Sequence, residues 1–144
     1  MRTAVCCILK NENHYIREWV EWYKNIGFTN AILYDNNDID GETLDEVISD
    51  YINEGFVIVK DVRGKTKQQL PCYQSCYDEY SNDYDWIAFF DADEFLEFDN
   101  NKNVDDFLNE DIFKDAEFIK ICWKNFNDIF NSRSFHRIKT RSMA

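Results

Sequence analysis

Residues 86–95 read WIAFFDADEF, an apolar run that stops on two aspartates one residue apart. Side chains two positions apart lean the same way in an extended or turning backbone, so Asp91 and Asp93 can share one hard divalent cation through carboxylate oxygens. The pattern therefore predicts a buried strand that ends at a metal-held phosphate ligand. The simpler interpretation, in which the aspartates only end the strand, stays open.

The composition is that of one packed domain. A chain of 144 residues buries roughly two thirds of its unfolded-chain surface, which is enough for one hydrophobic core. Apolar residues make up 44% of the chain and aromatic residues 17%, while glycine and proline are scarce. We therefore expect a single domain over residues 1–144, without a long linker.

The formal net charge of −12 argues against a nucleic-acid-binding protein, because a phosphate backbone would be repelled over most of the surface. An anionic ligand would need a bridging cation. A basic stretch near the end is the exception, and it consists of Arg133, His136, Arg137, Lys139 and Arg141. We expect a solvated tail there, and contact with phosphate, with a membrane surface or with a further part of the protein is the alternative.

Two features of the sequence predict a cytoplasmic location. The five cysteines are an odd number, and Cys72 and Cys76 are four apart, which suits packing on a helix better than tetrahedral zinc. No apolar run approaches the length of a transmembrane helix or of a signal peptide. Peripheral contact with the inner face of a membrane, through the basic stretch, is compatible with this location.

Strand and helix patterns alternate along the chain. Continuous apolar runs predict buried strands at 3–9, 31–34, 56–59 and 86–90. Three helices are predicted between them, one with Asn13 as N-cap and ending at Gly27, one from Asp40 to Gly55, and one with Pro71 in its first turn. Three strand–helix–strand units with apolar strands predict an α/β, Rossmann-like fold, in which helices cover both faces of a mostly parallel sheet.

The part of the chain after the two aspartates has a different pattern. Asn103 is placed to cap a short helix, and residues 118–123 read as a late strand that joins the sheet antiparallel. We therefore expect the parallel sheet to carry an antiparallel addition.

Ligands of open parallel sheets bind beyond the carboxyl ends of the strands, so the residues that follow each strand belong together. Here these residues are polar after all four strands. They are 10–12 (Lys-Asn-Glu), 35–37 (Asp-Asn-Asn), 61–65 (Asp to Lys) and Asp91, Asp93 and Glu94. Such a concentration of carboxylates, amides and cations at one edge predicts a binding site.

Five segments in this order and spacing resemble a glycosyltransferase family 2-like group with the GT-A fold. They are 6–12 (CCILKNE), 18–27 with its two tryptophans and Gly27, 34–37 (YDNN), 69–76 with Gln69, Cys72, Tyr73 and Cys76, and 86–95. The resemblance covers about residues 3–98. It implies a nucleotide-sugar-dependent transferase that takes a UDP- or GDP-sugar donor and a glycan or lipid-linked acceptor.

The same resemblance implies roles for particular residues. Asp91 and Asp93 would bind Mn2+ or Mg2+ on the donor diphosphate, and Asn11 and Glu12 would line the nucleotide pocket. Asp35 would approach the base or the ribose, and Lys67 or Gln69 would lie near the donor. For each of these residues a structural role stays open: Asn11 or Asn13 as a helix cap, Asp35 in an ordinary turn, and Lys67 and Gln69 in a solvated loop.

Physical reasons support these roles. A sugar that leaves a nucleoside diphosphate builds negative charge on the departing oxygen, and a cation held by Asp91 and Asp93 stabilises that charge as a Lewis acid. Basic side chains at 63–67, namely Arg63, Lys65 and Lys67, are candidates to add to this stabilisation. Carboxylates such as Glu12 and Asp35 suit ribose hydroxyls, which donate hydrogen bonds to an ionised acceptor.

Transfer with inversion needs a general base that deprotonates the acceptor hydroxyl. Asp128 is the best-placed candidate in the sequence. Glu94 is open between a supporting or acceptor-contacting carboxylate and a solvated one. The acceptor region of the family is usually longer than residues 99–144, so we expect this side to be partial.

Two other classes of protein compete with the transferase. A haloacid dehalogenase-type phosphatase also sets Asp-x-Asp after an apolar strand, but its motif lies at the start of the domain, whereas three strand–helix units precede Asp91 here. An inactive nucleotide-sugar-binding module would keep the fold and the donor site without turnover.

Overall fold

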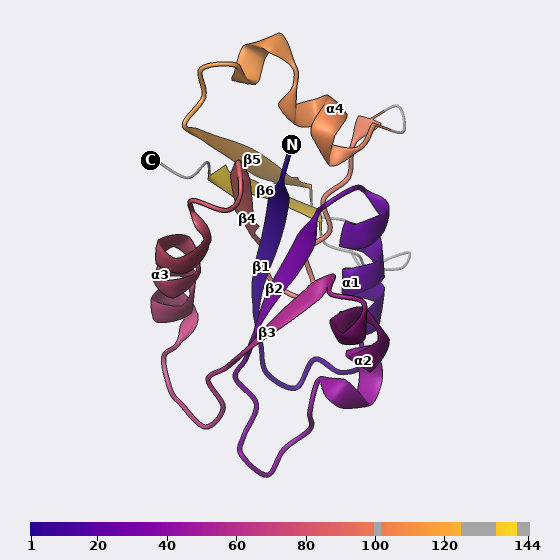
Figure 1. The fold of residues 1–144 in the computed structure, drawn as a ribbon, viewed down its shortest axis with the longest axis vertical. Helices are drawn as coiled ribbons and strands as arrows, with labels where there is room; N and C mark the ends of the chain where they lie inside the picture. Colours follow the sequence, from indigo (N-terminus) through magenta and orange to yellow (C-terminus); the bar gives the residue numbers. More distant parts are fainter. Residues whose placement is uncertain (100–101, 125–134, 141–144) are drawn as a thin grey trace.

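The computed structural model describes residues 1–99, 102–124 and 135–140 as a six-stranded sheet with helices on both faces (Figure 1). The strands are β1 (Thr3–Leu9), β2 (Asn30–Asp35), β3 (Val57–Asp61), β4 (Trp86–Phe89), β5 (Phe118–Lys124) and β6 (Phe135–Thr140). The helices are α1 (Ile16–Asn25), α2 (Asp45–Asn53), α3 (Gln69–Tyr80), α4 (Val104–Leu108) and the short 3-10 helix η2 (Asp111–Phe113).

Four parallel strands form one side of the sheet, in the spatial order β3-β2-β1-β4, and they confirm the predicted α/β fold. The chain first builds outward from β1 to β3 and then returns to place β4 on the other side of β1. Because parallel crossovers have one hand, this reversal puts α1 and α2 on one face and α3 on the other, as Figure 1 shows.

Each face of the sheet carries its own hydrophobic core. On the α1 side, Trp19, Tyr23 and Phe90 are among the largest fully buried side chains. On the α3 side, Cys6 of β1 packs with Cys72 and Cys76, and both helical cysteines are buried, as the packing interpretation of their spacing predicted. Strands covered on both faces need side chains that are apolar at every position, which explains their unbroken apolar runs.

Two helix starts differ from the predictions. The N-cap of α1 is Tyr15, and the side chain of Asn13 instead donates a hydrogen bond to the Thr43 carbonyl oxygen at 2.9 Å. The N-cap of α2 is Leu44, so the helix begins five residues after Asp40. Asn13, which could cap a helix, thus binds the loop after β2 instead. The predicted helix ends are confirmed, with Gly27 and Gly55 at φ of +98° and +84°.

The remaining strands extend the sheet beyond β4. The predicted short helix is confirmed with a capping box at Asn103, and the predicted late strand is β5. The predicted solvated tail is wrong for Phe135–Thr140, which forms β6 and pairs antiparallel with both β4 and β5. Alternating charged residues hid this strand, because no apolar run marks it. Asp128, Arg133 and Arg141 lie outside the described residues.

None of the helices in the described part of the chain is both long enough and apolar enough to cross a membrane.

A core substitution tests the packing of the parallel sheet. Ile32→Ala should lower the free energy of unfolding by about 2–5 kcal/mol, because Ile32 is 0% exposed and its loss leaves a cavity. Ile112→Ala is the matched control, since Ile112 is 79% exposed and its loss should change stability by less than about 0.5 kcal/mol. Urea denaturation measures both, and equal losses would contradict the position of Ile32.

Candidate functional site

The carboxyl ends of β1 and β4 lie side by side at the point where the strand order reverses. The loop after β1 carries Asn11 and Glu12, and the turn after β4 carries Asp91 and Asp93. A hydrogen bond of 3.1 Å from the Phe90 N–H to the Cys6 carbonyl oxygen continues the pairing up to this turn. In open α/β sheets this crevice is where ligands bind.

Helix α1 holds the turn after β4 in place through three aromatic donors. The indole N–H of Trp19 donates to the Asp91 carbonyl oxygen at 3.0 Å, and that of Trp22 donates to the Leu96 carbonyl oxygen at 2.8 Å. The buried Tyr23 hydroxyl donates to the Glu94 carbonyl oxygen at 3.0 Å and accepts from the Leu96 N–H at 3.1 Å. The sequence contains a signal for this role, namely polar-tipped aromatics at i, i+3 and i+4 on one helix face.

The side chains of Asp91 and Asp93 are exposed at the carboxyl edge. One carboxylate oxygen of Asp91 lies 3.3 Å from the Tyr73 hydroxyl and 3.5 Å from the Gln69 amide nitrogen, both on α3. The Asp91 N–H donates to the Glu94 carboxylate at 3.1 Å. Glu94 is only 9% exposed, which excludes the solvated interpretation and makes it a support of the turn.

Negative charge gathers at this point of the molecule. Burial raises the pKa of Glu94 to about 7, and the charges of Asp91 and Asp93 add to the rise. Burial and the charges of Asp93, Glu42 and Asp91 also raise the pKa of Glu12. The structure therefore brings Glu12, Asp91, Asp93 and Glu94 together, and a bound cation would relieve their mutual repulsion.

The donor set fits a hard divalent cation that is only partly held by protein. In the ranges that the structure describes, no three His, Cys, Asp or Glu side chains are arranged to hold a metal ion together. A cation on Asp91 and Asp93 would therefore complete its shell with water and ligand oxygens. Mg2+ in particular is commonly held in this way, by one or two carboxylates and substrate phosphates.

An open cleft of about 550 Å³ lies between the end of β1 and the start of α3. It is lined by residues 8–10, by Asn36 and by residues 67–71, so that the predicted Lys67 and Gln69 both contribute. Gln69 also approaches Asp91, which joins the cleft to the carboxylates. The volume is in the range of small-molecule sites.

Two cleft-side loops contain residues in the left-handed region. Asn11 has a φ of +57° and Lys67 a φ of +54°. Asparagine adopts this conformation more readily than most residues, whereas for lysine it is uncommon. Strained backbone of this kind clusters at functional sites, where the surrounding structure holds it.

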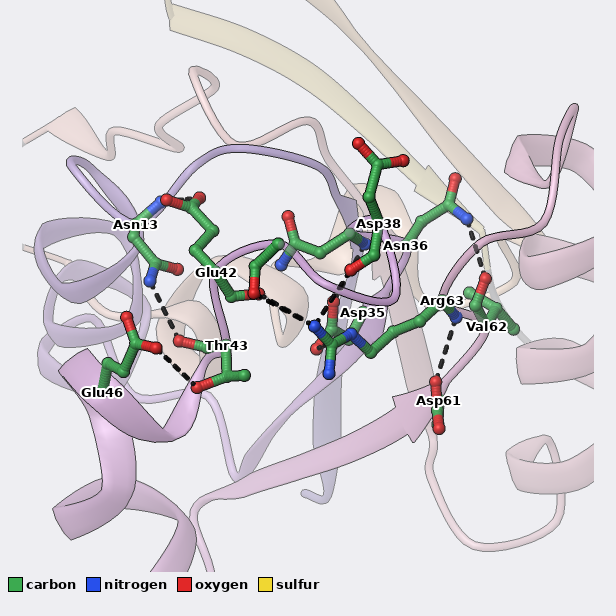
Figure 2. Close-up of polar contacts among 12 residues, drawn as sticks. Asn13, Asp35, Asn36, Asp38, Glu42, Thr43, Glu46, Asp61, Val62 and Arg63 are labelled. Atoms are coloured by element: carbon green, nitrogen blue, oxygen red, sulfur yellow. Dashed lines mark hydrogen bonds and ion pairs between the residues drawn. The ribbon is translucent and has the colours of Figure 1, made fainter.

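Asp35 and Arg63 lie beside this site but face the loops (Figure 2). The Asp35 carboxylate is buried, accepts from the Asn37 N–H at 3.0 Å, and lies 3.9 Å from the Arg63 Nε. The Arg63 guanidinium donates to carbonyl oxygens of the loop after β2, as Figure 2 shows. The predicted contact of Asp35 with a base or ribose stays a prediction.

Comparison with known proteins gives a consistent result. The family model described as Glycosyltransferase family 92 matches residues 2–143. A glycosyltransferase family 92 protein of Oryza sativa subsp. japonica is 30% identical over 105 residues, which cover 73% of this chain and 18% of that protein. A family 92 protein of Arabidopsis thaliana is 29% identical over 100 residues, covering 69% of this chain and 17% of that protein. The chain thus spans less than a fifth of the length of these curated relatives.

Removing one hydroxyl tests the support of the turn after β4. Tyr23→Phe should lower the free energy of unfolding by about 1–3 kcal/mol, because it leaves the buried Leu96 N–H without its acceptor. Tyr15→Phe makes the same chemical change at a side chain that is 61% exposed, and should have little effect. Denaturant unfolding of both variants checks this, and a neutral Tyr23→Phe would show that the hydroxyl does not hold the turn.

Proposed function

The chain belongs to glycosyltransferase family 92, and from this premise we propose that it binds a nucleoside-diphosphate sugar through a divalent cation and acts in transferring the sugar. The expected resemblance is confirmed at the level of a glycosyltransferase, the family shown is family 92, and the likeness to the family 2-like group stays a prediction. Membership of this family also decides against the phosphatase.

The observation that carries the proposal is the group of carboxylates beside the cleft. Asp91 and Asp93 are exposed, and their charges contribute to the raised pKa of both Glu12 and Glu94, which lie close to them. A diphosphate alone would be repelled from such a point, whereas a diphosphate with its cation would be attracted. This combination favours a metal-dependent donor over a free anion.

Asp91 and Asp93 would hold Mn2+ or Mg2+, which as a Lewis acid would stabilise negative charge on the departing diphosphate. Three neighbouring side chains orient Asp91. Glu94 accepts from the Asp91 N–H, and Tyr73 and Gln69 contact the Asp91 carboxylate from α3. Because these contacts already orient Asp91, less conformational entropy is lost when Asp91 binds the cation.

The cleft is where we place the nucleotide. Residues 8–10 at the end of β1 line it on one side, Lys67 and Gln69 line it on the other, and Asn11 and Glu12 follow directly after the β1 side. Lys67 is exposed and is suited to a phosphate oxygen. A UDP- or GDP-sugar donor, a glycan or lipid-linked acceptor, inversion and Asp128 as general base complete the proposal, and they rest on the resemblance.

A thermal-shift panel tests donor binding. UDP and GDP, each with and without Mn2+, should raise the melting temperature only when metal and nucleotide are both present, since a ligand specific for the folded state stabilises it. At a free ligand concentration 100 times the Kd, the gain is about 2.7 kcal/mol. Asp93→Ala should abolish the shift, because it removes a metal ligand.

Asp83→Ala is the matched control, since Asp83 is exposed and lies before β4, at the opposite end of that strand. It should keep the full shift. A shift without metal, or one that survives Asp93→Ala, would contradict the proposal. Release of nucleoside diphosphate from a panel of donors then separates a transferase from a donor-binding module without turnover.

A further inference from the structure

We propose that Arg63 is a positioning residue, which acts through two successive loops to hold Asn11 and Glu12 beside the carboxylates of the candidate site. Arg63 lies in the loop after β3 and contacts the loop after β2. That loop in turn contacts the loop after β1, which carries Asn11 and Glu12. This inference rests on the proposed function, because it assigns a purpose to the shape of the same site. The contacts that carry it are drawn in part in Figure 2.

The Arg63 guanidinium forms hydrogen bonds with three carbonyl oxygens in the loop after β2. Its Nη2 donates to the carbonyl oxygens of Asp38 at 3.0 Å, Gly41 at 3.3 Å and Glu42 at 3.4 Å. Three backbone acceptors on one nitrogen leave this turn little freedom. A planar guanidinium with five donors can serve several carbonyls and a carboxylate at once, which the ammonium of lysine does less well.

Hydrogen bonds also fix the backbone at Arg63. Its own backbone N–H donates to the Asp61 carboxylate at 3.0 Å, and the next residue, Gly64, donates to the Asn37 carbonyl oxygen at 2.9 Å. Gly64 has a φ of +72°, and an added Cβ would lie 2.9 Å from Ile39 Cγ1. The loops after β3 and β2 therefore approach closely, with Arg63 between them.

The first connection from Arg63 to the loop after β1 runs through Asp35 and Asn37. The Arg63 Nε lies 3.9 Å from the Asp35 carboxylate, which accepts from the Asn37 N–H at 3.0 Å. Asn37 is 1% exposed, and its side-chain oxygen accepts from the Asn11 N–H at 2.8 Å. This last hydrogen bond holds Asn11 in its left-handed conformation, and Glu12 follows directly.

The second connection runs through Glu42 and Asn13. Arg63 fixes the Glu42 carbonyl, and the Glu42 carboxylate accepts from the Asn13 N–H at 3.0 Å. The Asn13 side chain returns a hydrogen bond of 2.9 Å to the Thr43 carbonyl oxygen. Glu12 thus sits between two residues whose N–H groups are both bound by the loop after β2.

The two connections give a role to the Asp35–Arg63 ion pair, in which Asp35 is buried and Arg63 is partly buried, although the pair does not enter the site. Asp35 is 6% exposed, so its carboxylate depends on the neighbouring guanidinium. Loss of Arg63 would remove the cation beside Asp35 and the side-chain hydrogen bonds to three carbonyl oxygens, of which that of Asp38 would still accept from the Gly41 N–H. The loop after β2 would then stop presenting the Asn37 and Glu42 acceptors at fixed positions.

The experiment compares Arg63→Gln and Arg63→Lys with Arg17→Gln. Arg17 also joins two elements, donating to the Val47 carbonyl oxygen and to the Asp50 carboxylate, but it connects α1 with α2. Amide hydrogen exchange at Asn11 and Asn13 is measured by NMR, and the affinity for UDP with Mn2+ is measured by calorimetry. A merely structural arginine would lower the melting temperature without a specific effect on either readout.

We expect Arg63→Gln to speed exchange at both amides and to weaken the affinity about tenfold or more, with Arg63→Lys between it and the parent chain. Arg17→Gln should change neither. Unchanged exchange in Arg63→Gln, or an equal loss of affinity in Arg17→Gln, would overturn the inference. So would faster exchange with full affinity. If the parent chain binds no nucleotide with Mn2+, the proposed function fails, and the exchange rates still decide whether Arg63 holds the loop.

Discussion

The pairing of β1 with two parallel neighbours is the constraint on which the rest of this structure depends. β1 is hydrogen-bonded to β2 along one side and to β4 along the other, and it is buried over nearly its whole length. This pairing brings the end of β1 beside the end of β4. Asn11 and Glu12 therefore meet Asp91 and Asp93, although some eighty positions separate them in the chain.

The polar edge of the sheet is held by hydrogen bonds and the apolar interior by packing. On one side of the crevice, Trp19, Trp22 and Tyr23 of α1 bind backbone oxygens of the turn after β4. On the other side, Arg63 and Asn37 bind loops to one another. Fixed donors of this kind orient the loops that carry Glu12, Asp91, Asp93 and Glu94, and burial together with the neighbouring carboxylates raises the pKa of Glu12 and Glu94.

Local pattern was a good guide where one interaction dominated. Apolar runs predicted the four parallel strands, of which β1, β2 and β4 are mostly buried and the edge strand β3 only in part. Gly27 and Gly55 predicted helix ends because both adopt positive φ. The pattern failed where a residue had two possible partners. Asn13 could cap a helix or bind the loop after β2, and only the distance to Thr43 selects the second. β6 carries charged residues, so its place between β4 and β5 depends on pairing across the sheet.

By itself, the sequence determined the α/β class, the polar residues after each parallel strand, and the end of a strand at Asp91 and Asp93, because local composition indicates burial and strand ends. Only the tertiary structure decided that Glu94 is a buried support and that Arg63 faces the neighbouring loop. The physical reason is that the sequence around a charged side chain does not indicate which group it will contact in the fold. Its role depends on which distant backbone and carboxylate oxygens the fold brings within reach.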